Sequence, residues 1–147
     1  MSQRKSAAGL LVLALGLILE QNARAICAAP AEEGRWRNLT NTGEPSLIDV
    51  RMLGCNDQGE NGRIRYTMRA WVRQSSGQFY GRPTVDAEYR TWNAKRWMYG
   101  RIPTGGYVDH MWLRTENRDG QRQLHVLIKH ESLDRKPSAT SEFWFRH

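Results

Sequence analysis

The sequence predicts an all-β protein, an antiparallel meander closed into an up-and-down barrel of about eight strands. Short segments with an apolar residue at every second position recur along the chain, and turn residues separate them at regular intervals. Nearly every connection has hairpin length, which favours a meander, and closure into a barrel removes its exposed edges. A β-sandwich is the alternative, although its crossovers need longer connections.

Alternation and turn residues define the strands in order. The alternation is clearest at 63–73, where Ile64, Tyr66 and Met68 share one face and arginines occupy the other. Pro83 indicates that the short segment before it is an edge or a bend. The expected strands are 34–39, 47–53, 63–73, 78–82, 84–92, 97–102, 107–116, 122–131 and 139–146, with a turn at 93–96 between the fifth and the sixth.

The longest predicted hairpin spans 107–131 and turns at the Asp-Gly pair 119–120. This pair favours a type I′ turn, which fixes the register of the strands on either side. Met111 then faces Ile128 on an apolar surface. In the same register Asp109 faces His130, so we expect an Asp–His pair at the end of the buried face.

The first 25 residues have the pattern of a signal peptide. A basic pair at 4–5 precedes an apolar run at 7–19, and Ala-Arg-Ala at 23–25 fits a cleavage site. The apolar run is shorter than the roughly 20 residues of a membrane-spanning helix. We therefore expect a periplasmic or secreted protein, not integral to a membrane, with one domain at 26–147 that begins with a short tail. Ile26 disfavours a lipid anchor at Cys27.

Charge and cysteine content suit an exported chain. Residues 1–25 hold three of the 22 basic residues and one of the 15 acidic residues, which leaves the mature chain at +5. This charge favours an anionic envelope component or an acidic glycan as partner, and export argues against nucleic acid. In an oxidising compartment Cys27 and Cys55 are expected to form a disulfide that contributes roughly 3–4 kcal/mol.

The two ends of the mature chain resemble a known group of barrels. Gly34-Arg35-Trp36 begins the first strand and Arg146 ends the last, which resembles the signature of the lipocalin, avidin and fatty-acid-binding (calycin) group. The resemblance implies a barrel in which Arg146 covers Trp36 through a cation–π contact and both residues are structural. The layout also resembles small exported bacterial proteins of unknown function, and it implies no specific ligand.

The first functional hypothesis is a small apolar or amphipathic ligand bound inside the barrel, since eight strands leave room either for one small ligand or for side chains alone. The Asp109–His130 pair at the rim would orient that ligand or respond to pH. The expected ligand-binding residues are Tyr66, Met68, Tyr89, Asp109, Met111, Ile128 and His130, and Val85, Leu113, Val126 and Phe143 would complete the interior.

The second hypothesis is an envelope or extracellular interaction module that binds an anionic glycan, lipopolysaccharide or a protein through its outer face. Basic and aromatic side chains on one strand would provide charge and stacking. The residues of this patch are Arg63, Arg65, Arg69, Trp71 and Arg73.

A hydrolytic enzyme that uses Asp109 and His130 is a third and weaker hypothesis. The sequence contains no nucleophile elbow, zinc-protease motif, phosphate loop or dinucleotide fingerprint. We therefore expect a protein that is not an enzyme and has neither a cofactor nor a metal site.

Overall fold

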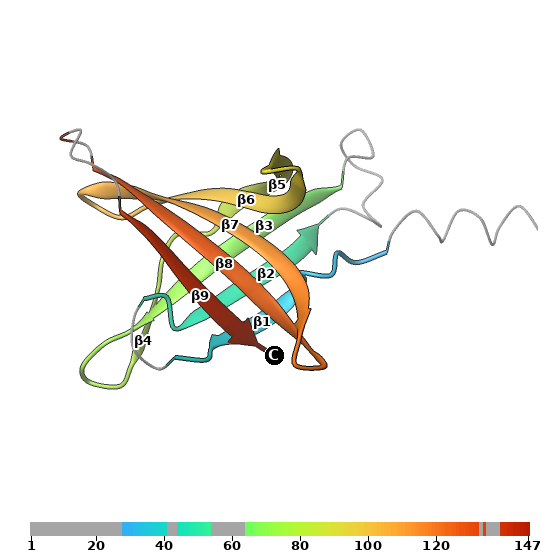
Figure 1. Ribbon diagram of the computed structural model, residues 1–147. Helices are drawn as coiled ribbons and strands as arrows, with labels where there is room; N and C mark the ends of the chain where they lie inside the picture. Colours follow the sequence, from blue (N-terminus) through green and yellow to red (C-terminus); the bar gives the residue numbers. More distant parts are fainter. Residues whose placement is uncertain (1–27, 41–43, 54–63, 133, 135–138) are drawn as a thin grey trace, which may run out of the picture.

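The computed structural model describes residues 28–40, 44–53, 64–132, 134 and 139–147. These residues form nine strands and no helix (Figure 1). Among them, no helix could cross a membrane. The strands are β1 (Gly34–Asn38), β2 (Leu47–Leu53), β3 (Arg65–Arg73), β4 (Phe79–Gly81), β5 (Val85–Trp92), β6 (Lys95–Pro103), β7 (Tyr107–Arg118), β8 (Gln121–Ser132) and β9 (Thr140–Arg146).

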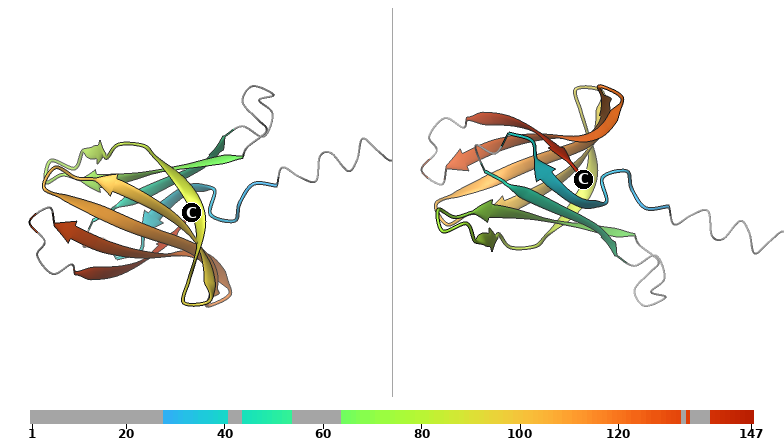
Figure 2. Two further views of the ribbon diagram at one scale, coloured as in Figure 1. Left: turned by 90° about the horizontal axis from the view of Figure 1, so that it is seen from above. Right: turned by 90° about the horizontal axis from the view of Figure 1, so that it is seen from below.

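Eight of the strands close into an antiparallel barrel. The order around the barrel is β1-β2-β3-β5-β6-β7-β8-β9, and β9 pairs again with β1. β4 pairs with the end of β3 and lies outside the barrel (Figures 1 and 2). The predicted all-β class and closed meander are confirmed, and the short segment before Pro83 is an edge strand as expected.

The β7–β8 hairpin has the predicted register along its whole length. Asp109 pairs with His130, and the pairing continues without a bulge to Arg118 opposite Gln121. The turn residues Asp119 and Gly120 have φ angles of 53° and 73°. Both values are positive, as a type I′ turn requires, so the local turn residues fix a long pairing.

The β5–β6 turn is shorter than the sequence predicts. Trp92 pairs directly with Lys95, so the turn is Asn93-Ala94 alone. Both residues have positive φ, 49° and 57°. The prediction of a four-residue turn at 93–96 is therefore wrong. Alanine has no intrinsic preference for this left-handed conformation, so the sequence contains no signal for the shorter turn.

Side chains fill the described interior of the barrel. Gly100 lies opposite Met68, and a Cβ on this glycine would come within 2.4 Å of the Met68 sulfur. Because Gly100 has no side chain, the long side chain of Met68 can extend across the interior. The buried cluster contains Trp36, Ile48, Val50, Met68, Ala70, Ala87, Met98, Ile102, Met111, Leu113, Leu124, Val126, Ile128 and Phe145, with Tyr66, Val85, Tyr89 and Phe143 packed against it.

Glu32, from the segment before β1, closes one end of the barrel, which we call the tail end. Its carboxylate accepts hydrogen bonds from the Tyr89 hydroxyl at 2.6 Å and the Thr115 backbone N–H at 3.1 Å. Its backbone carbonyl accepts the Trp36 indole N–H at 2.8 Å. Burial and the hydrogen bond with Glu32 raise the pKa of Tyr89. The buried carboxylate is thus satisfied by β5 and β7, and the backbone carbonyl of Glu32 by β1.

Several predictions concern residues beyond those described. Segment 1–25, Cys27, Cys55 and Arg63 all lie outside the described residues. The signal peptide and the Cys27–Cys55 disulfide stay predictions.

Candidate functional site

The predicted ligand-binding residues of the interior do face inward, but they pack against one another. Met111 and Ile128 are 1% and 2% exposed, and Tyr66 and Tyr89 lie edge to face with their ring centroids 5.5 Å apart. A cavity of about 30 Å³ lies beside Met111 and Ile128. Sites for small ligands usually measure roughly 300 Å³ or more, so this space suits a water molecule.

Asp109 and His130 are neighbours at the opposite end from Glu32, as the register predicts. His130 Nδ1 and Asp109 Oδ1 are 2.5 Å apart, and the two side chains are 37% and 16% exposed. The edge of the Tyr107 ring packs against the imidazole at 5.6 Å between centroids. Both residues line the small cavity. In the part of the chain that the structure describes, each side chain hydrogen-bonds only to the other, and a role in ligand orientation stays a prediction.

Arg146 does not cover Trp36, so the cation–π contact that the resemblance implied is wrong. Phe145 points inward and is fully buried, so its neighbour Arg146 points outward and is exposed. The ring of Trp36 instead lies 3.7 Å from the His147 ring, and the Arg122 guanidinium approaches it at 5.9 Å. Trp36 itself is fully buried and structural.

The outer face of β1, β2 and β3, which we call the basic wall, carries an ordered network around Asp49. Arg35 donates two hydrogen bonds to this carboxylate, at 2.7 and 2.9 Å, and the Trp71 indole N–H donates another at 2.8 Å. The hydrogen bonds from Arg35, together with that from Trp71 and the nearby positive charge, outweigh the effect of burial and lower the pKa of Asp49. Arg69 stacks on Trp71 at 4.2 Å.

The predicted outer patch is therefore divided. Arg65 pairs with Asp86 at 2.8 Å, and both side chains are mostly exposed. Arg69 donates to the Arg82 carbonyl at 2.9 Å and lies against Gly81, where a Cβ would come within 2.4 Å of the guanidinium. These two arginines serve contacts within the protein. Arg73 also lines an open depression, and in the described residues its side chain takes part in no ion pair.

That depression, the basic groove, has a volume of about 480 Å³. Arg37 and Arg146 form one side of it, and Arg73 comes from β3. In the described part of the chain these three exposed arginines take part in no ion pair. Glu44 also lines the groove, but it pairs with Arg82 at 3.3 Å. The other lining residues are Asn38, Ser46, Leu47, Gln74, Ser75 and Phe79.

The outer face of β6 to β9, together with Trp92, forms a second surface that we call the aromatic wall. Trp97 and Tyr99 point outward, yet they are only 4% and 7% exposed. Trp92 folds over this wall, with its ring 5.8 Å from Trp97 and 5.3 Å from Trp112. The tight Asn93-Ala94 turn holds Trp92 at the end of β5, from which its ring covers the adjacent strands.

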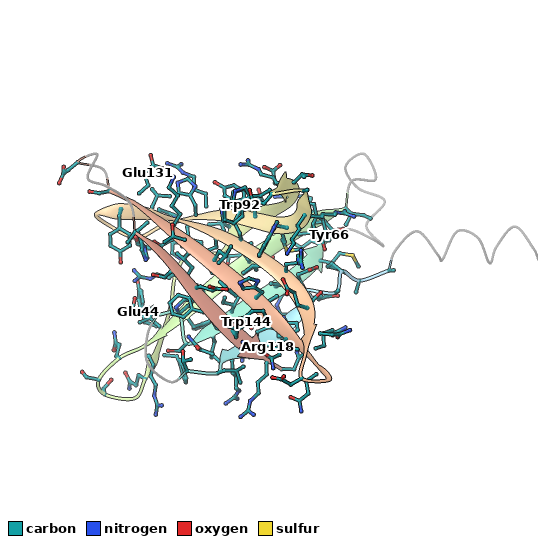
Figure 3. All side chains as sticks on the ribbon, viewed as in Figure 1. Glu44, Tyr66, Trp92, Arg118, Glu131 and Trp144 are labelled. Atoms are coloured by element: carbon teal, nitrogen blue, oxygen red, sulfur yellow. The ribbon has the colours of Figure 1, made fainter. Side chains whose placement is uncertain are left out.

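Charged groups on the aromatic wall contact rings and one another. His125 stacks on Trp144 with centroids 4.2 Å apart, and it lies between Glu116 at 3.1 Å and Glu142 at 2.6 Å. Burial would raise the pKa of Glu116, but the hydrogen bond with His125 and the charge of Arg114 outweigh it and lower that pKa. Figure 3 shows Trp144 and Arg118 close together on this wall; the guanidinium lies 4.7 Å from the ring centroid.

No protein-family model matches this chain, nor does any curated protein or solved structure. The barrel is compatible with a calycin-like architecture. The functional assignment therefore rests on the chain's own geometry.

Sequence reasoning missed Arg37 in the groove, Asp49 in the network and Glu32 at the tail end. Alternation places Arg37 and Asp49 on an outer face but does not indicate which strands lie beside them. Glu32 lies in a segment without periodicity, and we find no sequence signal for its burial.

Proposed function

We propose that this protein is an exported interaction module that binds an acidic glycan, of the lipopolysaccharide class, on its basic wall. The observation that carries the proposal is the basic groove, where three exposed arginines surround one depression. Guanidinium groups bind phosphate and carboxylate through paired hydrogen bonds. Phe79, 48% exposed at the side of the groove, offers a surface for the apolar face of a sugar ring.

The packing of the barrel favours the surface over the interior as the place of binding. An interior ligand would have to displace buried side chains such as Met68 and Met111, each 1% exposed. Close-packed cores resist such rearrangement. The prediction of a small apolar ligand in the interior is therefore the less favoured of the two binding hypotheses.

A binding role also suits the chemistry of the polar pair at the rim. Asp109 and His130 satisfy each other, and the cavity beside them holds about 30 Å³. Hydrolysis would require that a substrate reach the imidazole together with a nucleophile and groups that stabilise developing charge. The pair supplies one base and its orienting carboxylate, so we propose that the protein is not a hydrolase.

Export places the groove where acidic glycans occur. The signal peptide predicted at 1–25 directs the chain to the periplasm or the outside, where the mature charge of +5 favours anionic surfaces. The arginines of the groove add a local site to this general attraction. Relationship to the lipocalin and avidin group stays a resemblance.

Charge reversal in the groove tests this function. Arg73→Glu should weaken binding of the purified protein to immobilised lipopolysaccharide by about tenfold or more, measured by biolayer interferometry at constant ionic strength. Arg101→Glu is the matched control, because Arg101 is exposed on β6, away from the groove, and the change in net charge is the same. Equal losses in both variants would contradict a local site, and equal binding to neutral dextran would contradict recognition of acidic groups.

A further inference from the structure

Two arginines of the basic groove face each other directly across neighbouring strands. Arg37 on β1 is paired with Arg146 on β9, and both side chains are exposed on the outside of the barrel. Directly opposed residues on one sheet face lie within reach of each other, and like charges in this position destabilise the pairing. Without a bound anion, this arrangement lowers the stability of the folded protein.

This repulsion lies where the barrel closes. β1 and β9 are joined by two residue pairs, Arg37 with Arg146 and Asn38 with Phe145. The β7–β8 hairpin, by comparison, is paired from Tyr107 to Arg118. The backbone N–H of Leu39, just after β1, also donates to the Trp144 carbonyl at 2.9 Å. A like-charge pair therefore forms one of the two residue pairs in this short seam. Such local conflicts tend to mark functional sites.

A third arginine adds to the positive charge of the basic groove. Arg73 reaches the same groove from the end of β3, and Leu47, 9% exposed, lies between the strands that carry Arg37 and Arg73. Ser46 and Gln74 add polar groups to the lining. The acidic side chain of the groove, Glu44, is engaged by Arg82. An anion that enters the groove meets three positive charges and one carboxylate that is already paired.

We propose that the basic groove binds a phosphate monoester, and that the phosphate bridges Arg37 and Arg146 across the seam between β1 and β9. The inference rests on the proposed function and names the acidic group that the glycan carries. A phosphate monoester has three terminal oxygens and nearly two negative charges at neutral pH. It can give each of the opposed guanidinium groups its own oxygen and leave a third for Arg73. A carboxylate has two oxygens and one charge, which a single arginine satisfies.

Binding and closure of the barrel are then linked. A bridging phosphate replaces repulsion between Arg37 and Arg146 by attraction to a shared anion. A ligand that binds only the folded protein raises its melting temperature. We therefore expect phosphate esters to stabilise the protein and to protect the amides of β1 and β9 from hydrogen exchange.

Sugar probes that differ in one acidic group test the preference. Glucose 1-phosphate and glucuronate are titrated into the protein by calorimetry, with inorganic phosphate and glucose alongside and with the ionic strength held constant. We expect glucose 1-phosphate to bind at least about tenfold more tightly than glucuronate and to raise the melting temperature. Equal affinity for the two acids would overturn the inference while leaving the proposed function intact. If neither these sugars nor lipopolysaccharide binds, both fail.

Two further probes identify the source of the phosphate. Inorganic phosphate should bind more weakly than the sugar phosphate if a glycan carries the group. Vesicles of phosphatidylglycerol in phosphatidylcholine test a lipid headgroup. Stronger Arg146-dependent binding to these vesicles than to the sugar phosphate would overturn assignment of the phosphate to a glycan.

Arg146→Glu separates repulsion from binding. Without ligand this variant should melt at a higher temperature than the natural protein, because Arg37 then faces a carboxylate. It should also lose the stabilisation by glucose 1-phosphate. Arg101→Glu, which makes the same change in net charge on β6, should retain it. Retained stabilisation in Arg146→Glu would overturn the inference.

The neutral variant Arg146→Gln provides a check that does not depend on a new ion pair. It removes the repulsion and one ligand contact, and it should bind glucose 1-phosphate at least about tenfold more weakly without a lower melting temperature. A lower melting temperature in both variants would show that Arg146 stabilises the seam and would contradict the like-charge argument.

Discussion

The two outer walls of the barrel differ in how their polar groups are used. On the aromatic wall the rings cover one another, and Trp97 is 4% exposed although it faces away from the barrel interior. His125 lies between two glutamates and against Trp144. On the basic wall Asp49 organises Arg35 and Trp71, while the groove beside this network remains open and rich in arginine.

This difference separates a structural surface from a surface available for binding. Both walls contain tryptophan and arginine, so composition alone does not distinguish them. The Trp144 ring contacts both His125 and Arg118, so these side chains cover part of it. In the basic groove, exposed charge and open space occur together. We infer that the aromatic wall acts as a second packed layer and that the basic wall carries recognition.

The largest expected effect tests whether the aromatic wall is a packed layer. Trp97→Ala should lower the free energy of unfolding by about 3 kcal/mol, because a nearly buried tryptophan leaves a large void. Trp71→Ala on the basic wall should cost about 1–2 kcal/mol, since that ring is half-buried. Urea denaturation monitored by circular dichroism measures both values. A smaller loss for Trp97 than for Trp71 would contradict the distinction between the walls.

The network on the basic wall should give the protein a sensitivity to acid. The folded pKa of Asp49 lies below its unfolded value, so its contribution is complete above about pH 4 and is lost as pH falls through the folded pKa. Asp49→Asn should cost about 1–2 kcal/mol at pH 7 and flatten this part of the stability profile. Urea denaturation between pH 2 and about pH 7 measures the profile.

The aromatic wall offers the matched carboxylate for this measurement. The pKa of Glu116 is also lowered, with His125 and Arg114 as the partners that favour its ionised form. Glu116→Gln should therefore flatten a separate part of the acid profile. If Asp49→Asn leaves the profile unchanged while Glu116→Gln flattens it, the acid sensitivity belongs to the aromatic wall and the argument for the Asp49 network is wrong.

Sequence reasoning succeeded where a local signal determines the structure. The Asp119-Gly120 turn fixed a register that places Asp109 beside His130 and Met111 beside Ile128, as observed. A shift of one residue would reverse both faces of the hairpin, so agreement at one pair implies agreement throughout. Alternation likewise predicted the residues that fill the core.

Sequence reasoning failed where strands that are distant in the sequence lie side by side. The pairing of Arg37 with Arg146 depends on how far β9 is displaced along β1 when the barrel closes, and the alternation of single strands does not contain this displacement. The alternation of a single strand also contains no signal that Trp97 is buried on the outer face. Its burial depends on Trp92 folding across neighbouring strands, a contact that the pattern of one strand does not show.

A smaller effect tests the arginine contacts of the aromatic wall. Arg118→Ala should cost about 0.5–1 kcal/mol, the usual range for a guanidinium on a partly exposed ring. Lipopolysaccharide binding should not change, because this residue is outside the basic groove. Weaker binding together with unchanged stability would indicate that the aromatic wall also takes part in recognition.

The smallest expected effect concerns the predicted arginine patch itself. Arg65 pairs with Asp86, and their side chains are 59% and 70% exposed. Exposed pairs of this kind contribute about 0.5 kcal/mol or less, so Arg65→Ala should be nearly neutral in urea denaturation. Its effect on lipopolysaccharide binding should be well below that of Arg73→Glu, since Arg65 does not line the groove. If Arg65→Ala weakens binding as much as the groove variant does, recognition extends along β3, and the whole basic wall contributes to it in place of the groove alone.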